Sequence, residues 1–180
     1  MVNHCWLGNR SPRLRVSVSP RPSLPKAMRL RFVWPGKTRD AHVRALSEDY
    51  LKRLERFVRC EVTELRETVS DEPRVGIEKD SQRISDALRS GTVTVLLDRE
   101  GGERTSEQLA AEVERWQSEG TKEVSFVVGG PYGVSPALTA AADKRWSLSR
   151  LTFTHEMARV LLLEQLYRAY AIIHGLPYQK

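Results

Sequence analysis

The stretch from residue 123 to residue 136 constrains the fold most, because an apolar run stops at a glycine loop and the chain then restarts as a helix. The run EVSFVV over 123–128 predicts a buried strand. Glycines within 129–133 let the backbone approach a ligand where a Cβ would clash, and Ser135 followed by Pro136 is typical of a helix N-cap and first helical position. A strand, a bare loop and a helix start predict a small-molecule site, although a tight turn without a ligand would use the same residues.

The glycine loop fits neither of two common nucleotide-binding motifs. Gly129, Gly130 and Gly133 lack the G-x-G-x-x-G spacing of dinucleotide-binding proteins. The Lys-Ser/Thr pair of a P-loop does not follow them either. The loop therefore indicates a ligand other than a dinucleotide or a nucleoside triphosphate.

Strand patterns alternate with helix patterns along the chain from residue 28 onward. The predicted strands cover 29–34, 60–66, 92–98, 123–128 and 148–153, and the predicted helices cover the segment after Asp40 and about 74–89, 105–118, 135–142 and 156–174. Gly91 is placed to end the second helix, residues 99–103 are typical of a turn, and Thr105 with Gln108 predicts a capping box. The alternation predicts an α/β fold, with a parallel sheet and helices on both faces.

A parallel sheet also predicts where a ligand would bind. Ligands of such sheets gather at the carboxyl ends of the strands. Three segments end a predicted strand in probable loop: 97–98, 129–130 and 151–155. We therefore expect one pocket where these three segments meet.

Residues 1–27 differ in composition from the rest of the chain. They hold four of the nine prolines and five of the 29 basic side chains, with no acidic residue and no sustained periodicity. We interpret them as a disordered extension, or as a mis-assigned start with translation beginning at Met28, and 28–180 as a single domain. An organellar transit peptide is the alternative, but the prolines would interrupt its amphipathic helix.

The net charge of +6 is not evidence for a basic RNA-binding surface, because it resides almost wholly in the extension. Residues 28–180 keep 24 basic and 23 acidic side chains. Any surface for RNA must therefore come from the placement of charges on the fold. Since no apolar run reaches the length of a signal peptide or a membrane span, we expect a cytoplasmic protein that does not enter a membrane.

The two cysteines indicate neither a metal site nor a catalytic thiol. Cys5 lies in the extension, Cys60 lies in a predicted strand, and neither has the spacing of a metal ligand. We expect both thiols to be reduced, and we expect no bound metal.

Several separated motifs occur in a fixed order along the chain. They are MRLRFVWPGK over 28–37, GGPYGVS over 129–135, WSLSRLT over 146–152, EQLYRA over 164–169 and Pro177-Tyr178 near the last residue. In this order they resemble the ribosomal RNA large subunit methyltransferase H family, which are small enzymes of the knotted SPOUT class. The resemblance covers Met28 to Lys180 and leaves only residues 1–27 outside it.

The resemblance implies a cofactor, a target and a fold detail. The cofactor would be S-adenosyl-L-methionine, and the reaction would be methylation of N3 of a pseudouridine in a hairpin loop of 23S rRNA within the ribosome. The chain from about Val124 to the last helix would form a C-terminal trefoil knot, and the protein would be a homodimer in which each tail reaches towards the partner's pocket. By motif, the cofactor-binding residues would be Leu97, Gly130, Ser149, Arg150, Leu151, Thr152, Phe153 and Thr154.

Arg168 is the catalytic candidate that follows from this reaction. An imide N–H is a poor nucleophile until its proton leaves, and a permanent cation beside the resulting anion would stabilise it. The alternative is that Arg168 is a surface arginine, or that it pairs with Glu164 one helical turn away.

Two further positions, His155 and Gln179, have less certain roles. His155 would contact phosphate or base, or would only be hydrogen-bonded at a loop end. The family tail carries histidine where this chain has Gln179, which has no titratable site near neutral pH but can still position a substrate. Two alternatives stay open: a non-catalytic ribosome-binding or assembly factor, for which Gln179 is the best evidence, and a SPOUT methyltransferase with another RNA target.

The last predicted helix is apolar around more than one face. Its aliphatic and tyrosine side chains exceed what one small sheet needs to cover, so we expect this helix to contribute to a dimer interface. Tyr167, Tyr170 and Trp146 are expected to pack in the core or at that interface rather than to stack on bases.

Overall fold

The computed structural model describes residues 28–178 and contains one five-stranded parallel sheet. Its strands are β1 (Arg29–Pro35), β2 (Arg59–Leu65), β3 (Val93–Gly102), β4 (Glu123–Val128) and β5 (Lys144–Trp146), in the spatial order β2-β1-β4-β3-β5. All four neighbouring pairs are parallel. The central strand β4 is buried along its whole length, as its unbroken apolar pattern predicts.

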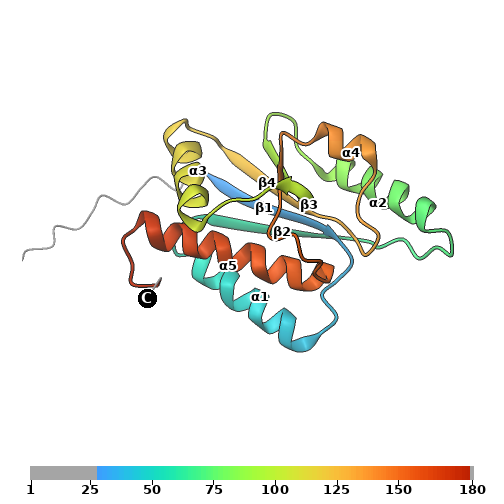
Figure 1. Cartoon of the computed structure of the whole chain (residues 1–180), viewed down its shortest axis with the longest axis horizontal. Coiled ribbons are helices and arrows are strands. Elements are labelled where there is room, and N and C mark those ends of the chain that lie inside the picture. The colour runs from blue at the N-terminus through green and yellow to red at the C-terminus, as the bar shows by residue number, and fades with distance from the viewer. Residues whose placement is uncertain (1–27, 179–180) are drawn as a thin grey trace, which may run out of the picture.

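Five helices cover both faces of the sheet, as Figure 1 shows. One face packs on α1 (Ala41–Leu54), α3 (Ser106–Ser118) and α5 (His155–Ile173), with Leu30, Phe32 and Phe126 in the core between them. The other face packs on α2 (Pro73–Ala87) and α4 (Pro136–Ala141) around a smaller apolar cluster. The predicted α/β fold with helices on both faces is confirmed.

The predicted helix starts are made by side-chain caps. The Asp40 carboxylate accepts hydrogen bonds from the backbone N–H groups of His42 and Val43, and Thr105 with Gln108 forms the complete capping box. Ser135 and Thr154 cap α4 and α5 in the same way. These caps satisfy donors that a helix end otherwise leaves unpaired. Together they fix where the chain leaves each loop.

The predicted fifth strand at 148–153 is wrong: β5 lies earlier, at Lys144–Trp146, and 148–153 is loop. Serines explain the difference, because the Ser147 hydroxyl donates to the Ser149 carbonyl and the Leu151 N–H donates to Ser149 Oγ. Such local side-chain bonds compete with a strand ladder.

Two smaller expectations are also corrected. The segment 99–103 is not a simple turn, since β3 continues to Gly102, which pairs with Trp146 after a shift in register. A Cβ at Gly101 would come within 2.7 Å of the backbone carbon of Arg145, which explains the glycine there. Gly91 has a positive φ of 74°, but α2 ends earlier, at its C-cap Leu88.

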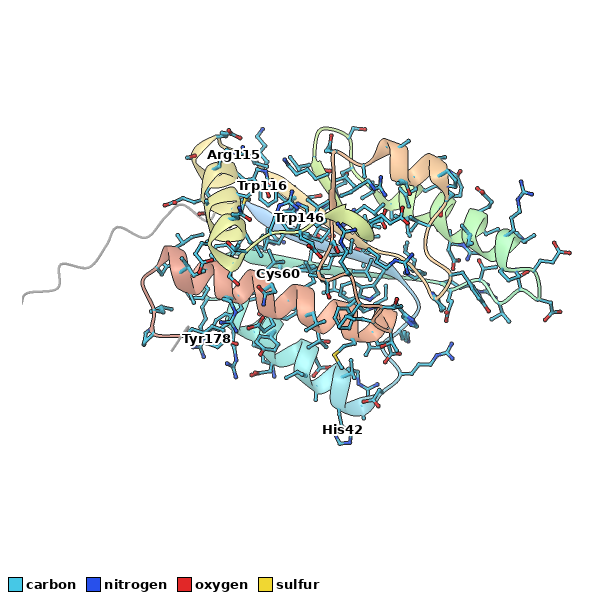
Figure 2. The ribbon with its side chains drawn as sticks, viewed as in Figure 1. His42, Cys60, Arg115, Trp116, Trp146 and Tyr178 are labelled. Atoms are coloured by element: carbon cyan, nitrogen blue, oxygen red, sulfur yellow. The ribbon has the colours of Figure 1, made fainter. Side chains whose placement is uncertain are left out.

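Most of the apolar surface of α5 is covered within the chain itself. The helix lies between α1 and α3 against the sheet, and Leu162, Leu163 and Leu166 are fully buried. Tyr170 is also core, and Trp146 stacks on Trp116 with ring centroids 5.7 Å apart (Figure 2). The dimer expectation therefore cannot rest on the whole of α5. No helix of residues 28–178 is both long and apolar enough to cross a membrane.

Candidate functional site

A cavity of about 520 Å³ opens where β3 and β4 end and α5 begins. Its walls come mainly from three segments that are distant in sequence, 97–99, 128–134 and 146–155, with Thr139 of α4 and Ala158 of α5 added. These segments overlap the three that the sequence predicted for the pocket, 97–98, 129–130 and 151–155, and they lie at the predicted edge of the sheet. The volume lies within the usual range for sites that bind small molecules.

Most of the residues predicted to bind the cofactor meet at this cavity. Those that line it are Leu97, Gly130, Ser149, Leu151, Thr152 and Phe153. Arg150 and Thr154 do not line it: Arg150 is exposed and pairs with Glu103 at 3.3 Å, and Thr154 caps α5 by accepting a hydrogen bond from the Met157 N–H. Contact of Arg150 and Thr154 with the cofactor stays a prediction.

Close packing within the protein explains part of the glycine loop. A Cβ at Gly129 would lie 3.0 Å from Val134 Cγ1, and a Cβ at Gly130 would lie 3.3 Å from Pro35 Cγ. Gly133 has a positive φ of 87°, a backbone conformation that residues with a side chain rarely adopt. The loop is further fixed where the Ser135 N–H donates to Ser81 Oγ at 2.7 Å. The glycines therefore hold a preformed loop against β1 and α2, in addition to baring backbone at the cavity.

Few charges face the cavity. Asp98 and Arg99 lie at one end of the wall, and His155 lies in the first turn of α5. Partial burial and the nearby Arg159 guanidinium lower the pKa of His155 below its ordinary value, so its imidazole is neutral at pH 7. Burial alone would raise the pKa of Asp98, but hydrogen bonds from the Glu100 N–H and from Arg145 lower it overall, and the carboxylate is ionised.

Arg159 fastens the first turn of α5 to the end of β1. Its side chain is fully buried, and it donates to the Pro35 carbonyl at 2.7 Å and to Thr38 Oγ1 at 3.0 Å. The guanidinium also lies 5.0 Å from the centroid of the Trp34 ring. Burial lowers the pKa of Arg159 to about 10, which leaves it charged at neutral pH. This residue anchors the helix that carries His155.

Arg168 lies far from the cavity of its own chain. It is 13 residues beyond His155 along α5, which at the helical rise corresponds to about 20 Å. Its guanidinium pairs with Glu164, and this hydrogen bond raises the pKa of Arg168. Within the single chain, Arg168 therefore forms the ion pair with Glu164 that was the alternative to a catalytic role.

Tyr178, the last residue that the structure describes, lies over Arg168. The Tyr178 ring lies 4.9 Å from the Arg168 guanidinium, and its hydroxyl donates to Glu164 Oε1 at 3.2 Å. The same hydroxyl lies 3.3 Å from that of Tyr50 on α1. Figure 2 shows Tyr178 beside the end of α5 that is remote from its first turn. Gln179 lies outside the described residues.

The wall also includes residues for which no contact with the cofactor was predicted, among them Asp98, Trp146 and Tyr132. Asp98 lies in the segment 97–98 that was predicted to reach the pocket. Trp146 was predicted only to pack, yet it packs on Trp116 and also lines the cavity. Tyr132 is exposed at the mouth, and no local pattern distinguished it. Among residues 28–178, no group of three or more His, Cys, Asp or Glu side chains gathers to hold a metal ion.

This fold and cavity are typical of an α/β protein that binds a small molecule at the carboxyl ends of its strands. The chain belongs to the SPOUT methyltransferase family, whose model, described as "Predicted SPOUT methyltransferase", matches residues 28–179. A solved structure of a probable methylase family protein from Haemophilus influenzae shares the fold, with a TM-score of 0.52 and 10% identity over 84% of this chain and 70% of that one.

Relatives of known name align over nearly their whole length. A protein from Geobacter sp. named "Ribosomal RNA large subunit methyltransferase H" is 40% identical over 84% of this chain and 98% of its own. One of the same name from Gloeobacter violaceus is 42% identical over 84% of this chain and 98% of its own.

S-adenosylmethionine is the methyl donor of this methyltransferase, and the cavity suits it. Leu97, Val128 and Leu148 offer apolar walls for the adenosine rings, and bare backbone near Gly129 offers N–H and C=O groups to a base edge. A sulfonium cation needs no basic clamp, and few cations line the walls. When bound, the cofactor supplies an electrophilic methyl group.

Proposed function

We propose that the chain methylates N3 of a pseudouridine in a hairpin loop of 23S rRNA within the ribosome. The observation that carries this proposal is the convergence of six predicted cofactor-binding residues on one cavity in a chain of the SPOUT methyltransferase family. The relatives' name supports large-subunit rRNA as the target. The pseudouridine and its N3 atom come from the motif resemblance. A ribosomal substrate would place the protein in the cytoplasm.

The residues would act by binding, orienting and stabilising charge. The cavity walls hold the cofactor, and alignment of donor and acceptor atoms accounts for much of the rate. Arg168 places a permanent cation beside the imide anion that forms when N3 loses its proton, and the charge of that anion spreads onto the flanking carbonyl oxygens. Gln179 would position the base by hydrogen bonds, and His155, neutral at pH 7, would contact substrate at the cavity mouth.

A homodimer would bring Arg168 of one copy to the cavity of the other, because Arg168 lies too far from the cavity of its own chain. Within one chain the two lie at opposite ends of α5, so an active site that uses both needs a second copy. Exposed apolar side chains support an interface where α1 and α5 begin: Leu46, Leu151, Phe153 and Met157. In this assembly Tyr178 and Arg168 of one copy would face the cavity of the other. Light scattering at micromolar concentration should give twice the mass of the chain, and a monomer would contradict the proposal.

We also propose that the C-terminal part of the chain forms a trefoil knot. β5 lies at the sheet edge beyond β3, and the chain then returns through 147–154 to α5 on the opposite face from α4, a path that a knotted connection would take.

Residues 1–27 would be dispensable, so a chain starting at Met28 should bind the cofactor and turn over equally well. Their five positive charges would add only salt-sensitive RNA affinity.

Methyl transfer to defined ribosomes tests the proposed function. We expect single-turnover transfer to ribosomes that carry pseudouridine, and none to matched ribosomes with uridine at the same positions. Mass spectrometry of nuclease fragments would locate the methyl group on N3. Transfer to another nucleotide would favour a SPOUT methyltransferase with a different target. Retained cofactor binding without transfer to any ribosomal RNA would favour the assembly factor.

A further inference from the structure

Charge is distributed unevenly around the cofactor cavity. Among the described residues that line it, the full charges at neutral pH are those of Asp98 and Arg99, which follow Leu97 at the end of β3. The remaining walls are aliphatic, aromatic, glycine or neutral polar, apart from the neutral His155. A ligand with one charged end and one uncharged end would therefore bind in one orientation.

A side groove extends the charged end of the cavity. It has a volume of about 450 Å³ and shares Asp98, Val134 and Thr139 with the main cavity. Arg145 of β5 lines this groove and donates to Asp98 Oδ2 from Nε at 3.0 Å and from Nη2 at 2.5 Å. The groove thus places an anion and a cation side by side next to the cofactor site.

The Asp98–Arg145 pair keeps unused hydrogen-bonding capacity. Asp98 Oδ1 accepts one hydrogen bond, from the Glu100 N–H at 2.9 Å, and a carboxylate has about four acceptor sites. Arg145 has five N–H donors, and its described bonds to Asp98 use two of them. Their side chains are 23% and 40% exposed, so both ions are open to a ligand in the groove.

We propose that this groove binds the amino-acid end of S-adenosylmethionine, with the α-ammonium on Asp98 and the α-carboxylate on Arg145. The adenosine then lies against the uncharged walls of the main cavity. Placed in this way, the ammonium meets Asp98, with the carboxylate of Glu100 also lining the groove, and the α-carboxylate meets Arg145. The sulfonium lies between the two ends of the cofactor. The inference rests on the proposed use of this cavity for the cofactor, and it adds the direction in which the cofactor lies.

Three ligands that differ in one feature test the subsite by isothermal titration. S-adenosylmethionine has the amino-acid end and the sulfonium charge, S-adenosylhomocysteine has only the amino-acid end, and 5′-methylthioadenosine has neither. In Asp98→Asn and Arg145→Gln, the first two should bind about tenfold more weakly or worse, which is the loss expected for a charge-assisted hydrogen bond. Methylthioadenosine should bind within about twofold of wild type, which also shows that the cavity remains folded.

Asp49→Asn is the matched control. Asp49 pairs with Arg53 on the exposed side of α1, at 2.6 Å, so this variant removes the same charge away from the cavity. Its affinities for all three ligands should equal those of wild type.

Each other outcome overturns a distinct claim. Equal weakening of all three ligands in Asp98→Asn would mean a general distortion of the cavity. Weakening of S-adenosylmethionine alone would place Asp98 beside the sulfonium instead, and no weakening would remove the subsite. A wild-type protein that binds methylthioadenosine as tightly as the two larger ligands would overturn the subsite and leave the cofactor cavity intact. Failure of the wild type to bind any of the three would overturn both.

Discussion

The two ends of α5 present opposite chemical environments. At its first turn, His155 and Ala158 face an open cavity with few charges, and the buried Arg159 anchors the helix to β1. Near its last turns, Arg168 is paired with Glu164 and covered by the Tyr178 ring (Figure 1 shows both ends of the helix). One helix therefore carries the cofactor wall at one end and the candidate catalytic cation at the other.

The difference explains how one small domain can bind a cationic cofactor and also supply an arginine. A free guanidinium beside the cofactor would repel the sulfonium, whereas about 20 Å of helix and the Glu164 carboxylate separate the two charges within a chain. The cation would meet the cofactor only where a second copy brings its own α5 end to the cavity. If Arg168 is the catalytic cation, as we propose, the chemistry requires a dimer.

Arg168→Ala should have the largest effect. Removing one charge-stabilising donor lowers rates by about 10²-fold or more, so single-turnover methylation should fall by that factor while cofactor affinity stays unchanged. Arg53→Ala is the control, because Arg53 also lies over tyrosine rings of α1 and α5, 5.5 Å from the Tyr50 centroid. A wild-type rate in Arg168→Ala would remove the catalytic assignment.

Mixing two inactive variants tests whether the two ends of α5 act across copies. Ala158→Trp should fill the cavity that Ala158 lines, and it leaves Arg168 intact. Co-expressed with Arg168→Ala, it forms mixed dimers in which one cavity faces one intact arginine, so activity should return. If activity stays at the level of the separate variants, each site belongs to a single chain.

Gly130→Val should have the next largest effect, on cofactor binding. A Cβ at Gly130 would lie 3.3 Å from Pro35 Cγ and 3.7 Å from Asp80 Oδ2, and Gly130 itself lines the cavity, so S-adenosylmethionine should bind at least about tenfold more weakly. Overpacking should also destabilise the fold by about 1–3 kcal/mol. Titration calorimetry and thermal melts measure the two effects, and Gly76→Ala, with open space around its Cβ position, is the control for both.

Pro35→Ala in the same chain separates the two causes. It makes room on the β1 side, so stability should recover while the affinity stays low, because the ligand approaches the backbone of Gly130. Recovery of both would show that packing alone requires this glycine.

The cavity end of α5 was more predictable from sequence than the far end. The glycine loop and the carboxyl-end rule predicted the segments around Leu97 and Gly130, since strand ends follow from local patterns. The loop at 148–153 was missed because its serine hydrogen bonds outweigh its apolar residues. The Tyr50–Tyr178 contact joins residues 128 positions apart, and no local pattern reports such packing. Likewise, the pairing of Asp98 with Arg145 depends on β5 lying beside β3.

Gln179→His should change the methylation rate less than the variants above. The substitution introduces the family histidine, which can accept a proton near its ordinary pKa of about 6.5. If Gln179 positions the base by hydrogen bonds, as we propose, the rate increase should be smaller than about 10²-fold, the lower end of the range for general acid–base catalysis. Single-turnover rates across pH measure it, with Lys180→His as the control for an added imidazole in the tail. A rise of 10²-fold or more would mean that proton acceptance limits the native enzyme.

His155→Gln should have the smallest effect, on the pH dependence of stability at the cavity end. Burial and Arg159 lower the pKa of His155 in the folded chain, so the unfolded chain binds more protons at pH values below about 6.5. The unfolding free energy of the wild type therefore decreases as the pH falls through this range, and the positive end of the α5 dipole acts in the same direction. The variant should lose less stability than the wild type between pH 7.5 and about 5.5 in denaturant titrations. His42→Gln, at an exposed position of α1, is the control for the loss of an imidazole. If His155→Gln loses as much stability as the wild type, this imidazole is not held neutral by the fold.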